Sequence, residues 1–309
     1  MSKKTVLLFA GQGAQQVGMG HDIWEKYELV RHIFAKADKQ LGYSIGNIAF
    51  DGPVEMLTRT LYAQPALYVH GYALLMLLRE LAPNLKYDAV AGLSLGEFTA
   101  HAAAGTFTFE DGLNLVARRA EFMEEAASRT KGSMAALIGG EYADAVALAQ
   151  AVGADIANLN APGQIVISGS AESIRKAVNV SRDYKIRRII ELQVSGAYHS
   201  SLMSSARVKL GQVLEDTPMK EPAVEVLSNY KAVPVHDPVE IRDALAKQVT
   251  GSVRWAESMQ LLLNGGFTRF VEIGPGAVLT GLMSRINKEV EAFCISDLQT
   301  LDAAVSHFQ

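Results

Sequence analysis

The sequence Gly-Leu-Ser-Leu-Gly at residues 92–96 fits the pattern G-x-S-x-G, in which a serine occupies a sharp turn between a strand and a helix. The flanks supply that context, because 88–91 reads as a short buried strand and 97–104 as a helix of small residues. The two glycines allow the tight turn and a close approach of strand and helix. The Ser94 hydroxyl would then lie beside helix N–H groups that can stabilise an oxyanion. The five-residue pattern alone is common, but with these flanks it predicts a nucleophilic serine.

Composition restricts the classes of protein to which the chain can belong. Its 309 residues are 49% hydrophobic and 20% charged, as in globular proteins with a large core. A net charge of −4 gives no overall positive field, so we expect no nucleic-acid partner. The longest apolar stretch, 66–78, is too short to span a bilayer, and the single cysteine, Cys294, excludes a disulfide within the chain. These features predict a soluble, cytoplasmic protein without a membrane partner.

Candidate strands and helices alternate along the chain, which predicts an α/β fold with a mostly parallel sheet. Residues 6–9 form a buried apolar run typical of such a strand. Pro65 suits the first position of a helix that runs to about residue 81. Thr108 begins a pattern that resembles a capping box and predicts a helix to about residue 129. Residues 268–273 predict a further strand, followed by Gly-Pro-Gly and a helix.

The middle of the chain has a different order of elements, β-α-β-β-α-β, which is the ferredoxin-like pattern. The predicted elements are strands at 133–138, 155–159, 164–168 and 187–194, with helices at 142–152 and 171–182. We therefore expect an inserted small domain at 130–197. The larger domain would be discontinuous, made of 1–129 and 198–309, and a cleft between two such bodies is a natural ligand site.

A catalytic serine needs a base within hydrogen-bond reach. His101 lies two helical turns beyond the serine, about 10 Å along the axis, which is too far for direct proton transfer. His199 follows a predicted strand and precedes a predicted helix, where α/β folds place reactive groups. Position thus favours His199 but leaves the assignment open, and no acidic third residue can be chosen from the sequence.

A glycine-rich loop at 11–15 follows the first predicted strand. It resembles the dinucleotide fingerprint G-x-G-x-x-G, but Gln16 occupies the last position, so the match fails. Such a loop can instead offer backbone N–H groups to an oxyanion. No Walker loop and no metal-ligand spacing occurs, so we expect neither a metal nor a cofactor.

Two adjacent arginines, Arg118 and Arg119, lie on the predicted helix that starts at Thr108. The apolar stripe of this helix consists of Leu113, Val116, Ala120 and Met123. At about 100° per residue, Arg118 points away from the stripe and Arg119 lies at its edge. Arg119 could therefore present its guanidinium in a cleft, or it could form a structural ion pair.

The chain resembles the malonyl-CoA:acyl carrier protein transacylases, the acyltransferases of fatty acid and polyketide synthesis. The resemblance covers essentially the whole length, and several motifs in the right order are more specific than any one of them. The matching stretches are 9–15, 92–97, 119–123, 160–164, 194–199, Gln248 and 272–276.

The resemblance implies an α/β-hydrolase-like core with a ferredoxin-like insert, in agreement with the pattern of elements. It implies that Ser94 is the nucleophile, that His199 is its base and that Gln248 helps to order this pair. In this family the histidine is oriented without an acidic residue, which would explain why none could be found.

The resemblance also assigns the groups around the acyl chain. The N–H groups of Gln12 and Leu95 would form the oxyanion hole, and Arg119 would bind the malonyl carboxylate. The chain departs from the family at Leu93, where many relatives have histidine, and at Tyr198, where phenylalanine or serine is usual. Tyr198 would border the acyl pocket, so the preference between malonyl and branched malonyl groups stays open.

The activity implied is transfer of a malonyl group from malonyl-CoA to the phosphopantetheine thiol of acyl carrier protein, through a seryl ester, to supply extender units for fatty acid synthesis. The expected partners are the coenzyme A thioester and the carrier protein, and we expect a monomer. Three alternatives remain: a polyketide-pathway acyltransferase, an acyl hydrolase on the same scaffold, and a non-catalytic module that binds carrier protein. Arg119 argues against the hydrolase, and the intact Ser94 and His199 argue against the non-catalytic module.

Overall fold

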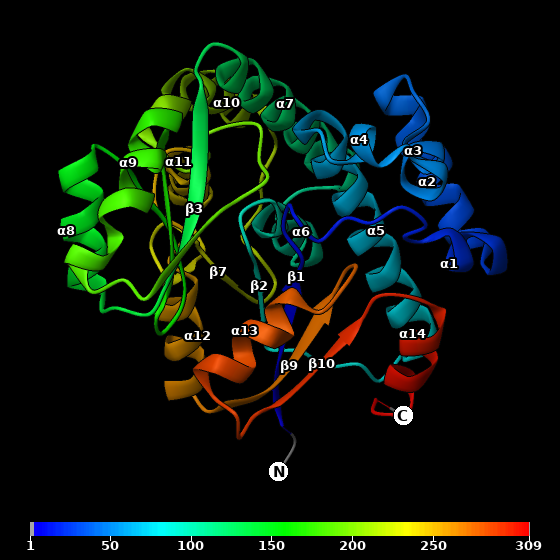
Figure 1. Cartoon of the computed structure of the whole chain (residues 1–309). Coiled ribbons are helices and arrows are strands. Elements are labelled where there is room, and N and C mark those ends of the chain that lie inside the picture. Colours follow the sequence, from blue (N-terminus) through cyan, green and yellow to red (C-terminus); the bar gives the residue numbers. More distant parts are fainter. Residues whose placement is uncertain (1–2, 309) are drawn as a thin grey trace.

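The computed structural model describes residues 3–308. Its larger sheet has the strand order β10-β9-β1-β2-β7-β8, in which every neighbouring pair is parallel except β7 with β8 (Figure 1). The strands are β1 (Lys4–Phe9), β2 (Ala89–Gly92), β7 (Glu225–Leu227), β8 (Pro234–Val235), β9 (Phe267–Ile273) and β10 (Glu291–Ile295). The central strands are short apolar runs, as expected where helices cover both faces. The predicted α/β fold with a mostly parallel sheet is confirmed.

Side chains of β1 alternate between two apolar layers, because successive residues of a strand face opposite sides. Leu7 and Phe9 belong to a core shared with α5 (Thr60–Leu81), α6 (Leu95–Ala103) and α7 (Phe109–Ser128). Val6 and Leu8 pack in a second cluster with α12 (Trp255–Asn264) and α13 (Val278–Ile286). The sheet is thus buried between two helical layers. The remaining helices are α1 (His21–Lys26), α2 (Glu28–Leu41), α3 (Ile45–Asp51), α4 (Val54–Leu57), α10 (Ser204–Asp216), α11 (Pro238–Gln248) and α14 (Leu298–Val305), with a 3-10 turn, η2 (Ser201–Met203).

Helix α5 begins at Thr60, five residues before the predicted start, so Pro65 lies inside the helix. A tertiary contact supports the added turn, because the Leu61 N–H donates to Glu124 Oε2 at 2.8 Å and Arg59 pairs with the same carboxylate. Among residues 3–308, α5 alone is long and apolar enough to cross a membrane, but 78% of its apolar window is buried inside the protein. Its apolar surface is therefore already covered by the rest of the chain.

A second, antiparallel sheet has the order β4-β5-β3-β6 and lies beside the larger one (Figure 1). Its strands are β3 (Gly132–Ile138), β4 (Asp155–Ala161), β5 (Gln164–Ser170) and β6 (Arg188–Glu191). Helices α8 (Tyr142–Val152) and α9 (Ala171–Val180) pack on it around a separate apolar cluster, and a 3-10 turn, η1 (Ser181–Tyr184), follows α9. β6 is shorter than the predicted strand at 187–194, and the chain beyond it runs toward the larger sheet.

Close backbone contacts dictate the glycines at the carboxyl ends of β1 and β2. A Cβ on Gly92 would lie 1.9 Å from the carbonyl carbon of Gly96, and a Cβ on Gly96 would lie 2.1 Å from the Phe9 carbonyl oxygen. A Cβ on Gly11 would lie 2.3 Å from the Leu93 carbonyl oxygen. Only glycine permits these approaches, so the residues that define the sequence motif also set the spacing of β1, β2 and α6.

We expect Gly92→Ala to lower the free energy of unfolding by about 3 kcal/mol or more, because the methyl group fits only if the α6 backbone moves. The matched control is Gly211→Ala in α10, where an added Cβ meets nothing within 4 Å. There we expect a gain of about 0.5–1 kcal/mol from higher helix propensity. Urea unfolding measures both variants, and similar effects of the two would contradict this account.

Candidate active site

Ser94 occupies the sharp turn between β2 and α6. Its φ is 56° and its ψ is −105°, a conformation rare for a residue with a side chain and characteristic of functional sites. The turn places the hydroxyl at the N-terminus of α6, beyond the carboxyl end of β2. The strand–turn–helix context predicted around Ser94 is present, although the helix begins at Leu95 and not at Glu97.

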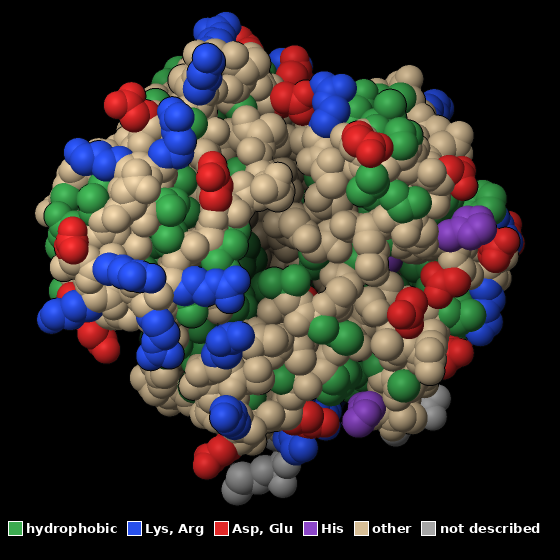
Figure 2. Space-filling view, viewed as in Figure 1, with side chains coloured by type: hydrophobic (Ala, Val, Ile, Leu, Met, Phe, Trp, Pro, Cys, Tyr) green, Lys and Arg blue, Asp and Glu red, His purple; other side chains and the backbone are tan. Residues whose placement is uncertain are grey.

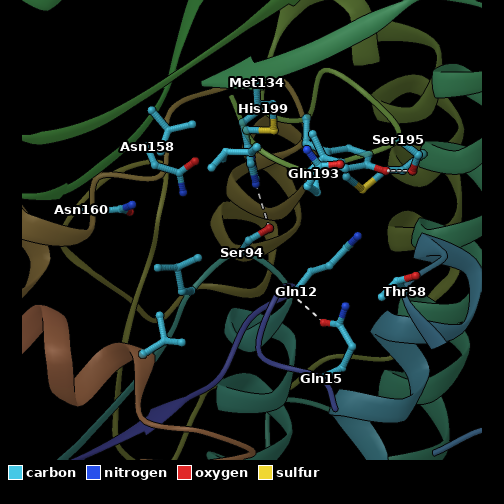
Figure 3. Close-up of a pocket in the computed structure, with 18 of the residues that line it drawn as sticks. Gln12, Gln15, Thr58, Ser94, Met134, Asn158, Asn160, Gln193, Ser195 and His199 are labelled. Atoms are coloured by element: carbon cyan, nitrogen blue, oxygen red, sulfur yellow. Dashed lines mark hydrogen bonds between the residues drawn. The ribbon is translucent and has the colours of Figure 1, made fainter. Parts of the chain in front are cut away.

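His199 lies directly opposite Ser94, on the segment that leads from the antiparallel sheet to η2 (Figure 3). The Ser94 Oγ and His199 Nε2 atoms are 2.8 Å apart. His199 Nδ1 lies 2.8 Å from the Gln248 carbonyl oxygen, which can only accept, so Nδ1 bears the proton. Nε2 is therefore the acceptor for the Ser94 hydroxyl, which is the arrangement a general base needs.

His199 is buried, and its pKa is lowered to about 4, mainly by burial and further by the charge of Arg119. The imidazole is thus neutral near pH 7 and able to accept a proton. His101 donates to or accepts from Thr106 Oγ1 at 3.0 Å and makes no contact with Ser94 in the hydrogen bonds of residues 3–308. The structure therefore brings His199, and not His101, to the serine.

Arg119 reaches the serine from α7, and its side chain is almost fully buried. Its Nη2 donates to Ser94 Oγ at 3.0 Å and to Gln248 Oε1 at 2.9 Å, and its Nη1 donates to Gln64 Oε1 at 2.7 Å. Arg118 is exposed and pairs with Glu121. The helix periodicity thus predicts correctly that Arg118, and not Arg119, points away from the core. Among residues 3–308 no carboxylate contacts Arg119 directly, so the structural ion pair considered as an alternative is not formed.

Gln12 lies on the loop after β1, and Leu95 is the first residue of α6, directly after Ser94 in the chain. The Gln12 side chain is fixed, since Nε2 donates to Thr60 Oγ1 at 3.1 Å and Oε1 accepts from Gln64 at 3.2 Å. The Leu95 N–H is one of the helix-start donors that have no intrahelical acceptor. Neither backbone N–H donates a hydrogen bond to any atom of the described chain, 3–308, so both are available to a ligand.

Three residues in the site had no predicted role. Asn229, after β7, accepts the Ser94 N–H with its Oδ1 at 2.6 Å and donates to the Gly92 carbonyl at 2.7 Å. Glu97 is fully buried in the first turn of α6, and Gln64 of α5 bonds both Arg119 and Gln12. Asn229 could have been suspected because it follows a strand, but its partner depends on the pairing of β2 with β7.

A cavity of about 400 Å³ opens over Ser94 and His199, between the two sheets (Figures 2 and 3). Its wall combines amides and apolar side chains, and includes Asn158, Asn160, Gln193, Met134, Val278 and Leu282. The Asn160 Oδ1 is buried and makes no hydrogen bond within residues 3–308. In the same residues no group of three or more His, Cys, Asp or Glu side chains is arranged to hold a metal ion. The site offers a hydroxyl, an unprotonated imidazole nitrogen and polar donors to a ligand of moderate size.

Comparison with known proteins places this geometry in a family. The model of the acyl transferase domain matches residues 6–300. The chain is 38% identical over 310 residues to a malonyl CoA-acyl carrier protein transacylase of Bacillus subtilis, covering 98% of this chain and 96% of that protein.

Solved structures agree with this assignment. An acyl-carrier-protein-S-malonyltransferase from Bartonella henselae superposes with a TM-score of 0.94 at 37% identity, covering 99% of both chains. A malonyl-transacylase solved in complex with its type II PKS acyl-carrier protein gives a TM-score of 0.95 at 32% identity, covering 98% of this chain and 99% of that one. The chain therefore belongs to the acyl transferase family and, within it, to the malonyl CoA-acyl carrier protein transacylases.

Proposed function

We propose that this chain transfers a malonyl group from malonyl-CoA to the phosphopantetheine thiol of acyl carrier protein through an ester on Ser94. The observation that carries the proposal is the hydrogen bond of 2.8 Å between Ser94 Oγ and the unprotonated Nε2 of a buried, neutral His199. Relatives named for this reaction share the whole length of the chain. They support supply of malonyl extender units, and a carrier complex among them belongs to a polyketide system.

The reaction would proceed in two half-reactions at one site. Ser94 attacks the thioester carbonyl while His199 takes the hydroxyl proton, and the N–H groups of Gln12 and Leu95 receive the oxyanion. Collapse of the tetrahedral intermediate releases coenzyme A, whose thiolate takes the proton from His199. The thiol of the carrier then gives its proton to His199 and attacks the seryl ester. When this second tetrahedral intermediate collapses, the bond to Ser94 Oγ breaks and His199 returns the proton to that oxygen, which restores free Ser94. Each proton is thus carried by His199, and the substrates supply every atom that is transferred.

Arg119 supports a substrate with a carboxylate. A buried guanidinium with no carboxylate in direct contact keeps part of its desolvation cost, which a carboxylate on a ligand would offset. Its Nε is buried and makes no hydrogen bond within residues 3–308, so one donor of the guanidinium is left unsatisfied by the described chain. A planar guanidinium can bind a carboxylate through two parallel N–H donors. An acyl hydrolase for neutral chains would have no use for this charge, so Arg119 favours the transacylase.

We also propose that the antiparallel unit is a ferredoxin-like small domain at 130–197, inserted in a catalytic domain made of 1–129 and 198–309. Its sheet order β4-β5-β3-β6 and its own apolar cluster support this division. The cavity over Ser94 would then lie between the two domains. Asn158 and Asn160 of β4 would be small-domain contributions to its wall.

Ser94→Ala should abolish the acyl-enzyme, because within residues 3–308 Ser94 carries the one hydroxyl that is hydrogen-bonded to the His199 ring. His199→Ala should slow acylation by about 10³-fold or more, because the serine loses its general base. Intact mass after brief exposure to malonyl-CoA, with and without carrier protein, measures both effects. Ser195→Ala, a serine in the same cavity, should still form the adduct. An undiminished adduct in Ser94→Ala would show that another residue holds the acyl group.

Arg119→Ala should reduce malonyl transfer by roughly one to several orders of magnitude, because loss of one partner of a buried charge pair costs about 2–5 kcal/mol. Acetyl transfer should fall much less, because acetyl has no carboxylate to bind. The measurement is the malonyl-to-acetyl ratio of kcat/KM. Arg118→Ala, the exposed neighbour, should leave both values nearly unchanged. An equal loss for the two substrates in Arg119→Ala would make Arg119 structural and favour the hydrolase.

A basic surface on the antiparallel unit fits an acidic carrier protein. We define this surface by five exposed residues on α9, η1, β6 and the turn between η1 and β6, which are Lys176, Arg182, Lys185, Arg187 and Arg188. Figure 2 shows Lys and Arg side chains gathered on this side of the molecule. The surface adjoins the cavity through a short series of contacts. Arg187 packs against Gly139, whose N–H donates to the Gly163 carbonyl oxygen. The next residue, Gln164, lines the cavity.

Charge reversal at two of these positions, Arg182→Glu with Lys185→Glu, should raise the KM for carrier protein and weaken its dependence on salt. The acylation half-reaction with malonyl-CoA should be unaffected. The matched control is Lys39→Glu, an exposed lysine on α2 away from this surface. An unchanged KM for the carrier would mean that the basic surface is only solvated.

A further inference from the structure

Glu97 is a fully buried carboxyl group one helical turn beyond the nucleophile. Its Oε2 accepts from Gln248 Nε2 at 2.6 Å and from the Asn229 N–H at 3.1 Å, whereas its Oε1 is buried and makes no hydrogen bond within residues 3–308. Burial of a carboxyl group without a directly paired cation is unfavourable, and an apolar side chain would avoid that cost. Glu97 takes no part in the proposed proton transfers between Ser94 and His199, so its burial needs another explanation.

The direction of the surrounding hydrogen bonds shows that the Glu97 carboxyl group acts as an acceptor. Arg119 can only donate, so the Gln248 oxygen faces Arg119 and the Gln248 NH2 group faces Glu97. The second partner, the Asn229 N–H, is also a donor. Oε2 therefore meets two donors and must act as an acceptor. An ionised carboxylate satisfies both donors more strongly than a neutral group does.

The two donors to Glu97 belong to the residues that hold the reacting pair. Asn229 fixes the serine, because its Oδ1 accepts the Ser94 N–H at 2.6 Å. Gln248 fixes both sides, because its carbonyl orients His199 at 2.8 Å and its Nε2 also donates to the Ser94 carbonyl at 2.9 Å. Glu97 thus connects Asn229, which holds Ser94, with Gln248, which holds His199.

We propose that Glu97 is a positioning residue which, in its ionised form, fixes Asn229 and Gln248 and so aligns Ser94 with His199. It also balances the charge of Arg119 through the intervening Gln248 side chain. The inference rests on the proposed function only in taking Ser94 as the nucleophile and His199 as its base. In a Ser-His-Asp triad the carboxylate is hydrogen-bonded to the histidine. Here the carboxylate of Glu97 lies on the side of the serine and acts through Asn229 and Gln248.

Burial raises the pKa of Glu97 to about 7, against the opposing effects of the hydrogen bonds from Gln248 and Asn229 and the charge of Arg119. Nucleophile activation that needs the carboxylate should therefore increase with pH through about 7. Stability has the opposite sign. The folded protein keeps the Glu97 proton up to about pH 7, whereas the unfolded chain releases it near 4.5, so this group's contribution to stability falls between those values as pH rises.

The other ionisable groups around Glu97 keep their charge between pH 6 and 8. On α7, Arg119 stays cationic, since burial lowers its pKa only to about 10. Burial lowers the pKa of His70 on α5 to about 4, that of His101 on α6 to about 3 and that of His199 to about 4, so all three are neutral. The ionisable residues of β1 and β7, Lys4 and Glu225, lie at the opposite end of the sheet.

The test is the rate at which a fluorophosphonate probe labels Ser94 between pH 6 and pH 8, followed by intact mass. This probe reports activation of the serine without using malonyl-CoA. In the wild type we expect the rate to rise about tenfold over this range, the ratio of ionised fractions for a group with a pKa near 7. In Glu97→Gln we expect a rate at least about tenfold lower at pH 8 and no rise through pH 7. The unfolding temperature of Glu97→Gln at pH 8 should not fall below that of the wild type, because the buried charge is gone.

The matched control is Glu272→Gln. Glu272 is another fully buried glutamate that accepts two backbone N–H groups, from Leu279 and Thr280, but it lies outside the site. This variant should keep the wild-type pH profile even where it is less stable.

Three results would overturn the proposal: a Glu97→Gln rate within twofold of the wild type, an inflection near pH 7 that persists in Glu97→Gln, and a wild-type profile that is flat from pH 6 to 8. The last does not depend on whether any variant folds. A wild type that reacts with the probe as expected but forms no adduct with malonyl-CoA would contradict the proposed function and leave the role of Glu97 supported.

Discussion

A guanidinium buried beside Ser94 organises the centre of this molecule. Water is excluded around Arg119, and its Nη1 and Nη2 donate to the amide oxygens of Gln64 and Gln248, which reach it from two other helices. The amide oxygen of each glutamine accepts from arginine, so its NH2 group must point the other way and donate to a second partner. The arginine thereby fixes the orientation of both amides. Through Gln64 that orientation reaches Gln12 in the loop after β1, and through Gln248 it reaches Glu97.

This arrangement explains why the site depends on so many separate segments. Ser94 belongs to the β2–α6 turn, His199 follows the antiparallel sheet, and Gln248 ends α11. The carboxyl ends of parallel strands meet at one edge of the sheet, which is where α/β folds collect loops of this kind. The close packing of Gly11, Gly92 and Gly96 then brings the loop after β1 against the turn that holds the serine.

Local signals are sufficient for features that depend on local geometry. The strand–turn–helix pattern predicts the sharp turn at Ser94, and the helix periodicity predicts that Arg119, and not Arg118, lies at the edge of the apolar stripe. Chain position favoured His199 without proving it, because its distance from Ser94 depends on the packing of two sheets. The start of α5 was placed at Pro65, since nothing near it in sequence shows that Glu124 stabilises an earlier turn.

The residues that hold Ser94 and His199 in place could not be predicted from the sequence, because their partners are also set by tertiary packing. Asn229 becomes meaningful only when β7 pairs with β2, and Glu97 only when Gln248 reaches it from a position 151 residues away. An amide or a carboxyl in a sequence does not reveal which donor it will meet. Interpretation of such residues therefore needs the tertiary contacts.

The antiparallel sheet does not form an isolated layer, because Met134 and Val166 pack in the same apolar core as Tyr198 and Phe122. That shared core sets the separation of 2.8 Å between Ser94 Oγ and His199 Nε2. A compact state with loosened side-chain packing would keep both sheets and most of the helices, as expanded acid states do. In such a state Ser94 would no longer lie against His199. The reactivity of Ser94 should therefore be lost before the secondary structure is, which makes it the more sensitive measure of tertiary packing.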